Sequence, residues 1–122
     1  MKNEQQAREV LAQQLAMNEQ SWRALQEHGV TEQSELRLDF FYVAPGKREA
    51  EDLCAFIQGE TDYDVRVGSS GGGFMRKKTW MVAGTTQPTK VSLDILNEWV
   101  GWMVAAGFER DCEFDGWGAQ AG

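Results

Sequence analysis

Residues 36–44 form the stretch that most constrains what this chain can fold into. Every second residue is apolar, and the face that results consists of Leu36, Leu38, Phe40 and Tyr42. Because successive side chains of a strand point to opposite faces, this set predicts a strand that packs against a core. The other face also becomes apolar toward its end, at Phe41 and Val43. Apolar residues on both faces favour a strand at the centre of a sheet.

Two helices and three further strands are expected after this strand. The helices are predicted at 47–58 and 93–106, and the strands at 63–67, 74–86 and 112–115. A turn is expected at 87–90, Ser92 is expected to be the N-cap of the second helix, and Gly107 is expected to cap its C-terminus. The order strand-helix-strand-strand-helix-strand is the βαββαβ, or ferredoxin-like, arrangement. Right-handed crossovers then place both helices on one face of a four-stranded antiparallel sheet. We therefore expect an α+β fold in which the first and third strands are central.

A long helix is expected ahead of this unit, over residues 3–28, because the segment lacks Pro and Gly and is rich in Gln, Glu, Ala and Leu. Gly29 is a typical C-terminal cap. One helical stripe consists of Leu11, Leu15, Asn18, Trp22 and Leu25. The stripe favours a helix that lies against the main domain, and a coiled-coil or partner-docking arm is the alternative. The expected division is an N-terminal helix at 1–30, packed on or flanking the domain, and a ferredoxin-like domain at 31–122.

The residues that usually carry catalysis are sparse in this chain. It has one histidine and two cysteines, Cys54 and Cys112, and none of them has a metal-ligand spacing. No nucleophile stands beside a base. The glycine-rich segment 68–73 lacks the Gly-Lys-Ser/Thr ending and the following helix of a phosphate-binding loop, so it is expected to be a hairpin tip. We expect no enzymatic activity, no cofactor and no metal site.

The net charge and the distribution of apolar residues limit the classes of partner that this chain is expected to bind. A net charge of −7 disfavours non-specific binding to nucleic acid, because the phosphate backbone has the same sign. It suits contact with basic or mixed-charge protein surfaces. The first residues lack the apolar core of a signal peptide, and no apolar run reaches membrane-spanning length. We expect a cytoplasmic protein with free thiols and no membrane contact.

Residues 112–118 are expected to form a short strand that breaks into a turn. Gly116 and Gly118 bracket Trp117 and can take positive φ at little cost, so the backbone can turn sharply around the indole. The indole is expected either to pack against a neighbouring element, which anchors the C-terminal strand, or to lie in an exposed recognition turn.

Acidic residues alternate along the same segment, at Asp111, Glu113 and Asp115. Alternation predicts that the three share one strand face. Charges on an edge strand discourage unwanted strand pairing, and they can also meet an arginine-rich segment of a partner.

The closing segment 114–119, Phe-Asp-Gly-Trp-Gly-Ala, and the aromatic strand 38–44 resemble the ribonuclease E inhibitor B (RraB) family of bacterial regulators. The resemblance covers about 36–119. It implies a ferredoxin-like regulator that binds the noncatalytic C-terminal scaffold region of ribonuclease E, changes the composition of the degradosome and lowers RNA cleavage. The candidate partner-binding residues are then Asp111, Glu113, Asp115, Gly116, Trp117, Gly118 and Phe41.

Two other functions remain open. A ferredoxin-like domain can bind RNA by stacking bases on aromatic residues of its central strands. The residues that this hypothesis would use are Phe41, Tyr42 and Trp80, with positive charge from Arg76, Lys77 and Lys78. The acidity of the chain opposes direct nucleic-acid binding. The third possibility is a homodimeric interaction domain that associates through the open sheet face or the leading helix.

Overall fold

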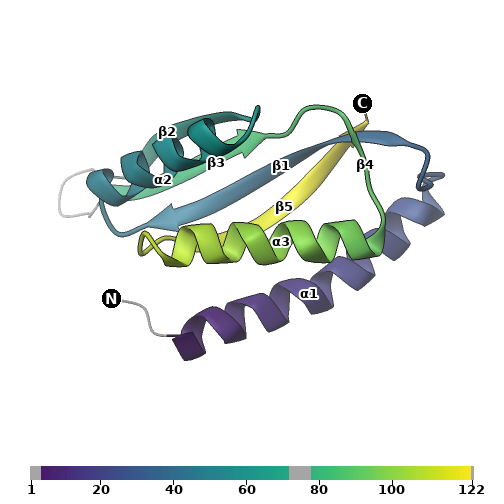
Figure 1. The fold of residues 1–122 in the computed structure, drawn as a ribbon, viewed down its shortest axis with the longest axis horizontal. Helices are drawn as coiled ribbons and strands as arrows, with labels where there is room; N and C mark the ends of the chain where they lie inside the picture. The colour runs from purple at the N-terminus through teal and green to yellow at the C-terminus, as the bar shows by residue number, and fades with distance from the viewer. Residues whose placement is uncertain (1–3, 72–77, 122) are drawn as a thin grey trace.

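The computed structural model describes residues 4–71 and 78–121 of the chain. Within these residues it is an α+β fold with an N-terminal helix, a five-stranded antiparallel sheet and two further helices (Figure 1). The elements in chain order are α1 (Glu4–Glu27), β1 (Glu35–Ala44), α2 (Lys47–Glu60), β2 (Asp64–Gly71), β3 (Lys78–Thr85), β4 (Thr89–Lys90), α3 (Leu93–Phe108) and β5 (Glu113–Ala121).

The strand β1 is the centre of the sheet, as its two-sided apolar pattern predicts. The hydrogen-bonded order is β2-β3-β1-β4, and β5 also pairs with β1. Phe41 pairs with Ala83 of β3 and with Gly116 of β5, so these two strands flank β1. Leu36 pairs with both Thr89 and Ala121, which places β4 and β5 along opposite edges of β1.

Two predictions about strands are wrong. The described sheet has a fifth strand, β4, because residues 89–90, expected to lie in a turn, pair briefly with β1. The last strand does not end at Asp115 but continues to Ala121. Gly116 does take positive φ, at 130°, yet it forms a bulge where the register against β1 shifts between Phe41 and Tyr42. A bulge absorbs one extra residue without reversing the chain, so the expected sharp turn around Trp117 is absent.

The hairpin of β2 and β3 is more extended than expected. The sequence predicts a loop from residue 68, whereas β2 continues to Gly71 and pairs there with Lys78. The remainder of the expected tip lies outside the described residues. So do Arg76 and Lys77, which the RNA-binding hypothesis would use.

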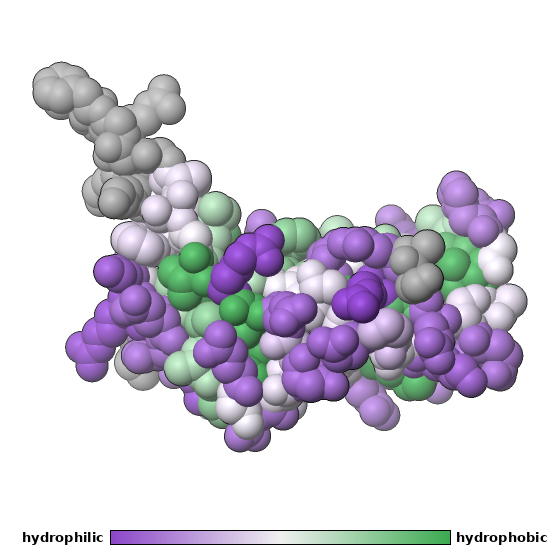
Figure 2. Space-filling model, turned by 90° about the horizontal axis from the view of Figure 1, so that it is seen from above, coloured by the Kyte–Doolittle hydropathy of each residue, from purple (hydrophilic) through white to green (hydrophobic). Residues whose placement is uncertain are grey.

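The core lies between the sheet and the two helices α2 and α3, which cover the same face of the sheet (Figure 1). Its fully buried side chains include Phe40, Tyr42, Leu53, Ile57 and Met103. The Tyr42 hydroxyl donates to the Met103 carbonyl at 2.7 Å, and burial raises the pKa of this tyrosine far above its ordinary value. Seen from above, hydrophilic residues cover most of the surface and hydrophobic residues form small clusters among them (Figure 2).

The helix α3 extends two residues beyond the prediction. Ser92 caps its N-terminus by accepting from the Ile95 backbone N–H at 3.2 Å, as expected. At the other end, Gly107 was expected to cap the helix but lies inside it, and Glu109 is the C-cap. Gly107 is buried, because the absence of a side chain there admits the ring of Tyr42.

The helix α1 lies alongside α3 and also contacts β5 (Figure 1). Its buried residues are Gln14, Asn18 and Trp22, so the predicted stripe is only partly buried. The cap at Gly29 is confirmed: Gly29 has a φ of 93°, its N–H donates to the Gln26 carbonyl, and that of Val30 donates to the Leu25 carbonyl, both at 3.0 Å.

Candidate functional site

The outward face of the sheet carries an exposed apolar cluster. Phe41, Val43 and Met81, here called the outer patch, are 45%, 40% and 36% exposed. They line a shallow hollow of about 330 Å³ together with Arg66 and Asp115, among others. The helices α2 and α3 cover the other face of the sheet, and α1 lies alongside α3. No described helix therefore covers these side chains.

The alternation of side chains along β1 explains why the outer patch lies on the outward face of the sheet. The even-numbered residues of β1 face the helices and are buried, so Phe41 and Val43 must face away from the helices. Met81 of β3 lies on the same face, because it pairs directly with Val43. Side chains at paired positions on one face lie close enough to touch, which makes the three residues one surface.

The acidic candidates border the outer patch. Glu113 pairs with Val43, and Asp115 lines the hollow beside Phe41. Asp111 lies in the turn before β5, with a φ of 61°, so the prediction that all three acids share one strand face is wrong for this residue. Asp111 nevertheless lines a second hollow of about 270 Å³ together with Glu113 and Val43. Aspartate is one of the few residues that tolerate positive φ at modest cost.

Trp117 points toward the helices instead of the outer patch. Its indole Nε1 donates to the Asn18 Oδ1 at 2.7 Å, and its ring meets that of Trp99 edge to face at 6.3 Å. Asn18 in turn donates to the Asn97 Oδ1 at 3.0 Å. Of the two interpretations, packing against a neighbouring element is therefore the correct one. The adjacent Gly118 pairs with Asp39 and borders a groove between α1 and β5.

The aromatic residues of the RNA-binding hypothesis do not share a face. Phe41 is exposed on the outward face, whereas Tyr42 is buried among the helices. Trp80 pairs with Ala44, another residue of the inward face, and packs against the core. Alternation along β1 explains the separation, since neighbouring residues of one strand cannot stack on the same side.

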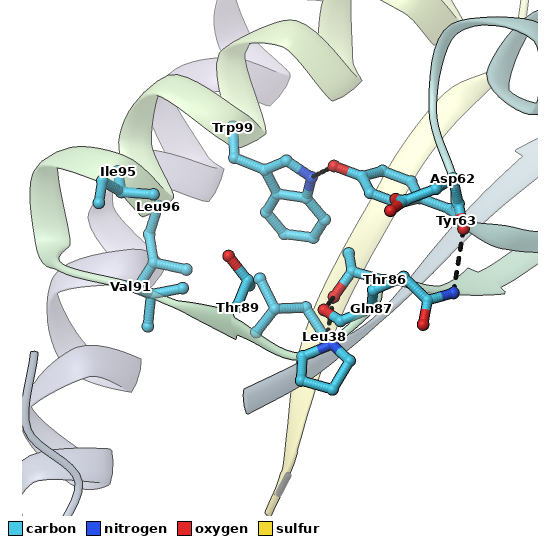
Figure 3. A pocket seen from close by; sticks show the side chains of 11 residues that line it. Leu38, Asp62, Tyr63, Thr86, Gln87, Thr89, Val91, Ile95, Leu96 and Trp99 are labelled. Atoms are coloured by element: carbon cyan, nitrogen blue, oxygen red, sulfur yellow. Dashed lines mark hydrogen bonds between the residues drawn. The ribbon is translucent and has the colours of Figure 1, made fainter. Parts of the chain in front are cut away.

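Sequence reasoning missed a further concavity, a cleft of about 270 Å³ on the helix side of the sheet (Figure 3). Its residues come from β1, the α2–β2 connection, the segment between β3 and α3, and α3 itself. Trp99 Nε1 donates to the Tyr63 hydroxyl at 3.2 Å across this cleft. No local pattern brings these four segments together, so no sequence signal marks the cleft.

The described residues offer little for metal or thiol chemistry. Among them no group of three His, Cys, Asp or Glu side chains is arranged to hold a metal ion. Cys54 and Cys112 are both buried and are not joined in a disulfide, and burial raises the pKa of the Cys54 thiol, which disfavours a reactive thiolate. In the same part of the chain, no helix combines the length and the apolar character needed to cross a membrane.

Neither a protein-family model nor a curated protein matches this chain. The function is therefore inferred from the geometry and charge of the outer patch.

Proposed function

We propose that this protein is a non-catalytic regulator that binds another protein through the outer patch. In keeping with the resemblance of its sequence, the partner is the C-terminal scaffold region of a ribonuclease E, and binding modulates RNA degradation in the cytoplasm. The observation that carries the proposal is an exposed apolar cluster, Phe41, Val43 and Met81, bordered by Asp111, Glu113 and Asp115.

The proposal includes a ferredoxin-like arrangement, with α1 and β4 as additions to it. The order of the long strands, β2-β3-β1-β5, supports this assignment, and so does the position of α2 and α3 on one face. In such an arrangement the outward face of the sheet is free for a partner.

Two physical features favour a basic protein partner. An exposed apolar cluster with a polar rim is a typical mark of a protein-interaction site. The acidic border and the net charge of −7 attract a positively charged segment and raise its association rate. The apolar centre then supplies contact area that excludes water, and the charged rim supplies orientation.

Phe41→Ala should weaken binding to the ribonuclease E scaffold region about tenfold, because a large aromatic side chain at the centre of a patch is a typical hot spot. The free energy of unfolding should fall by only about 1 kcal/mol, since the side chain is 45% exposed and the main loss is the strand preference of phenylalanine over alanine. Calorimetric titration of the purified scaffold region measures the first quantity, and urea denaturation measures the second.

Met17→Ala is the matched control for this experiment. Met17 is also an exposed apolar residue, at 54%, but it lies on α1. Equal loss of affinity in both variants would argue against the outer patch, and so would unchanged affinity in Phe41→Ala. The alternative is that a second copy of this chain binds the outer patch. Sedimentation of the protein alone tests this alternative, because self-association through the patch would be weaker in Phe41→Ala.

Neutralising the acidic border, with Asp111→Asn, Glu113→Gln and Asp115→Asn combined, should weaken binding and flatten its dependence on salt concentration. Charges at the rim of an interface act mainly on the association rate and are screened by salt. Stopped-flow association rates over a salt series provide the measurement. A control that removes two acids from the exposed side of α2, Glu51→Gln with Asp52→Asn, should keep a steeper salt dependence. Equal slopes would exclude a specific role for the border.

A further inference from the structure

The cleft of Figure 3 is separate from the outer patch, because it lies on the helix side of the sheet. One wall is apolar and is formed mainly by α3 and the segment that precedes it. That wall consists of Val91, Ile95 and Leu96, with Leu38 of β1 and the indole of Trp99 completing it. Figure 3 shows Trp99 pointing into the space above Leu38, with Ile95 at the outer edge of the cleft. A ligand with an apolar stem would find contact area here.

The opposite end of the cleft is polar and is held in place by two hydrogen bonds. Trp99 donates to the Tyr63 hydroxyl at 3.2 Å, and the Gln87 Nε2 donates to the backbone carbonyl of Asp62 at 3.0 Å. The Tyr63 hydroxyl therefore accepts from the indole and keeps its own proton available to a ligand. The second bond fixes the backbone from which the Asp62 carboxylate extends.

The Asp62 carboxylate supplies a negative charge at this end. It is exposed, and no Lys, Arg or His side chain among the described residues forms an ion pair with it. Its charge reaches the Tyr63 phenol: burial raises the pKa of Tyr63, the hydrogen bond from Trp99 lowers it, and the Asp62 carboxylate raises it again. A cation placed beside these groups would be stabilised by the same field.

We propose that this cleft binds a small organic cation, an amine or a guanidine joined to a short aromatic or aliphatic stem. The stem lies against Ile95, Leu96 and Trp99, and the cation faces Asp62 and the ring of Tyr63. The volume, about 270 Å³, is slightly below the range of about 300–1,000 Å³ that is usual for ligand sites, so only a fragment-sized molecule fits. This site is independent of the proposed regulator function.

Titration of the ¹⁵N-labelled protein with phenethylamine tests the proposal. The indole N–H resonance of Trp99, assigned with a Trp99→Phe variant, should shift and saturate, because this group lies in the cleft wall. The neutral isostere 2-phenylethanol should bind about threefold to fivefold more weakly, as expected for loss of one partly exposed ion pair.

Asp62→Asn should weaken phenethylamine binding by the same factor and leave 2-phenylethanol unaffected. Asp64→Asn is the matched control, because Asp64 is also exposed but shares the outward face of the sheet with Arg66. It should leave both affinities unchanged. Two outcomes would overturn the proposal: no saturable shift with either compound, or equal binding of both compounds that is insensitive to Asp62→Asn.

Discussion

Gly107→Ala is expected to lower the free energy of unfolding by about 3 kcal/mol, which is at the upper end of the usual cost of overpacking a core. A Cβ atom at this position would lie 2.6 Å from Cε2 of Tyr42 and 2.8 Å from the Cys112 carbonyl oxygen. Neither neighbour can retreat easily. The Tyr42 hydroxyl is bound to the Met103 carbonyl, and the Cys112 N–H donates to the Gly107 carbonyl at 2.9 Å.

Gly101→Ala is the control on the same helix. A Cβ atom at Gly101 meets nothing within 4 Å, so only the intrinsic preference of the helix for alanine acts. The expected result is a gain of about 0.5–1 kcal/mol. Urea denaturation of both variants measures the difference from the midpoints, provided that the slopes agree. If both substitutions stabilise the protein, the end of α3 does not pack against Tyr42 as closely as the structure indicates.

The error in predicting Gly107 shows what a sequence pattern can decide. Glycine near the end of an apolar stripe is the usual sign of a C-terminal cap, and at Gly29 the same reasoning is correct. At Gly107 the deciding contact comes from Tyr42, on a strand distant in the sequence. Local patterns identify elements, but a close approach between two elements depends on their packing, which no local pattern encodes.

The candidate site also has features that local sequence patterns predict and features that depend on packing. The alternation in β1 suffices to predict that Phe41 lies on the face opposite Phe40 and Tyr42. Whether Gly116 bends the chain or bulges a strand depends on pairing with β1, since positive φ is compatible with both. The cleft at Asp62 and Trp99 is formed by segments that are distant in the sequence. None of these segments carries a local pattern that predicts a binding site.

The inward position of Trp117 changes how the C-terminal motif contributes to the proposed function. Its indole connects β5 to α1 through Asn18, while the neighbouring Asp115 and Gly116 form the edge of the outer patch. One short segment therefore both holds the N-terminal helix and shapes the candidate interface. Substitutions at Trp117 are expected to act first on the attachment of α1, so loss of partner binding in such variants would need a folding control.

Asn18→Leu is expected to lower the free energy of unfolding by about 2 kcal/mol, because a buried polar group that loses its partner costs about 1–3 kcal/mol. Asn18 is completely buried, accepts from the Trp117 indole and donates to Asn97. Leucine has a similar size but lacks both the Oδ1 acceptor and the Nδ2 donor of asparagine, so the indole N–H would remain without its acceptor. Met17→Leu, at an exposed neighbouring position, should change stability by less than about 0.5 kcal/mol.

A double-variant cycle separates the hydrogen bond from packing. Trp117→Phe removes the donor and keeps an aromatic ring, so Asn18→Leu combined with Trp117→Phe leaves no stranded indole N–H. The combined loss should be smaller than the sum of the single losses by about 1 kcal/mol, because the two side chains share one interaction. Urea denaturation of the four proteins gives the coupling. Additive losses would mean that the Asn18–Trp117 hydrogen bond does not stabilise the protein, and that α1 is held by the Asn18–Asn97 bond and by apolar contacts around Trp22 and Leu25.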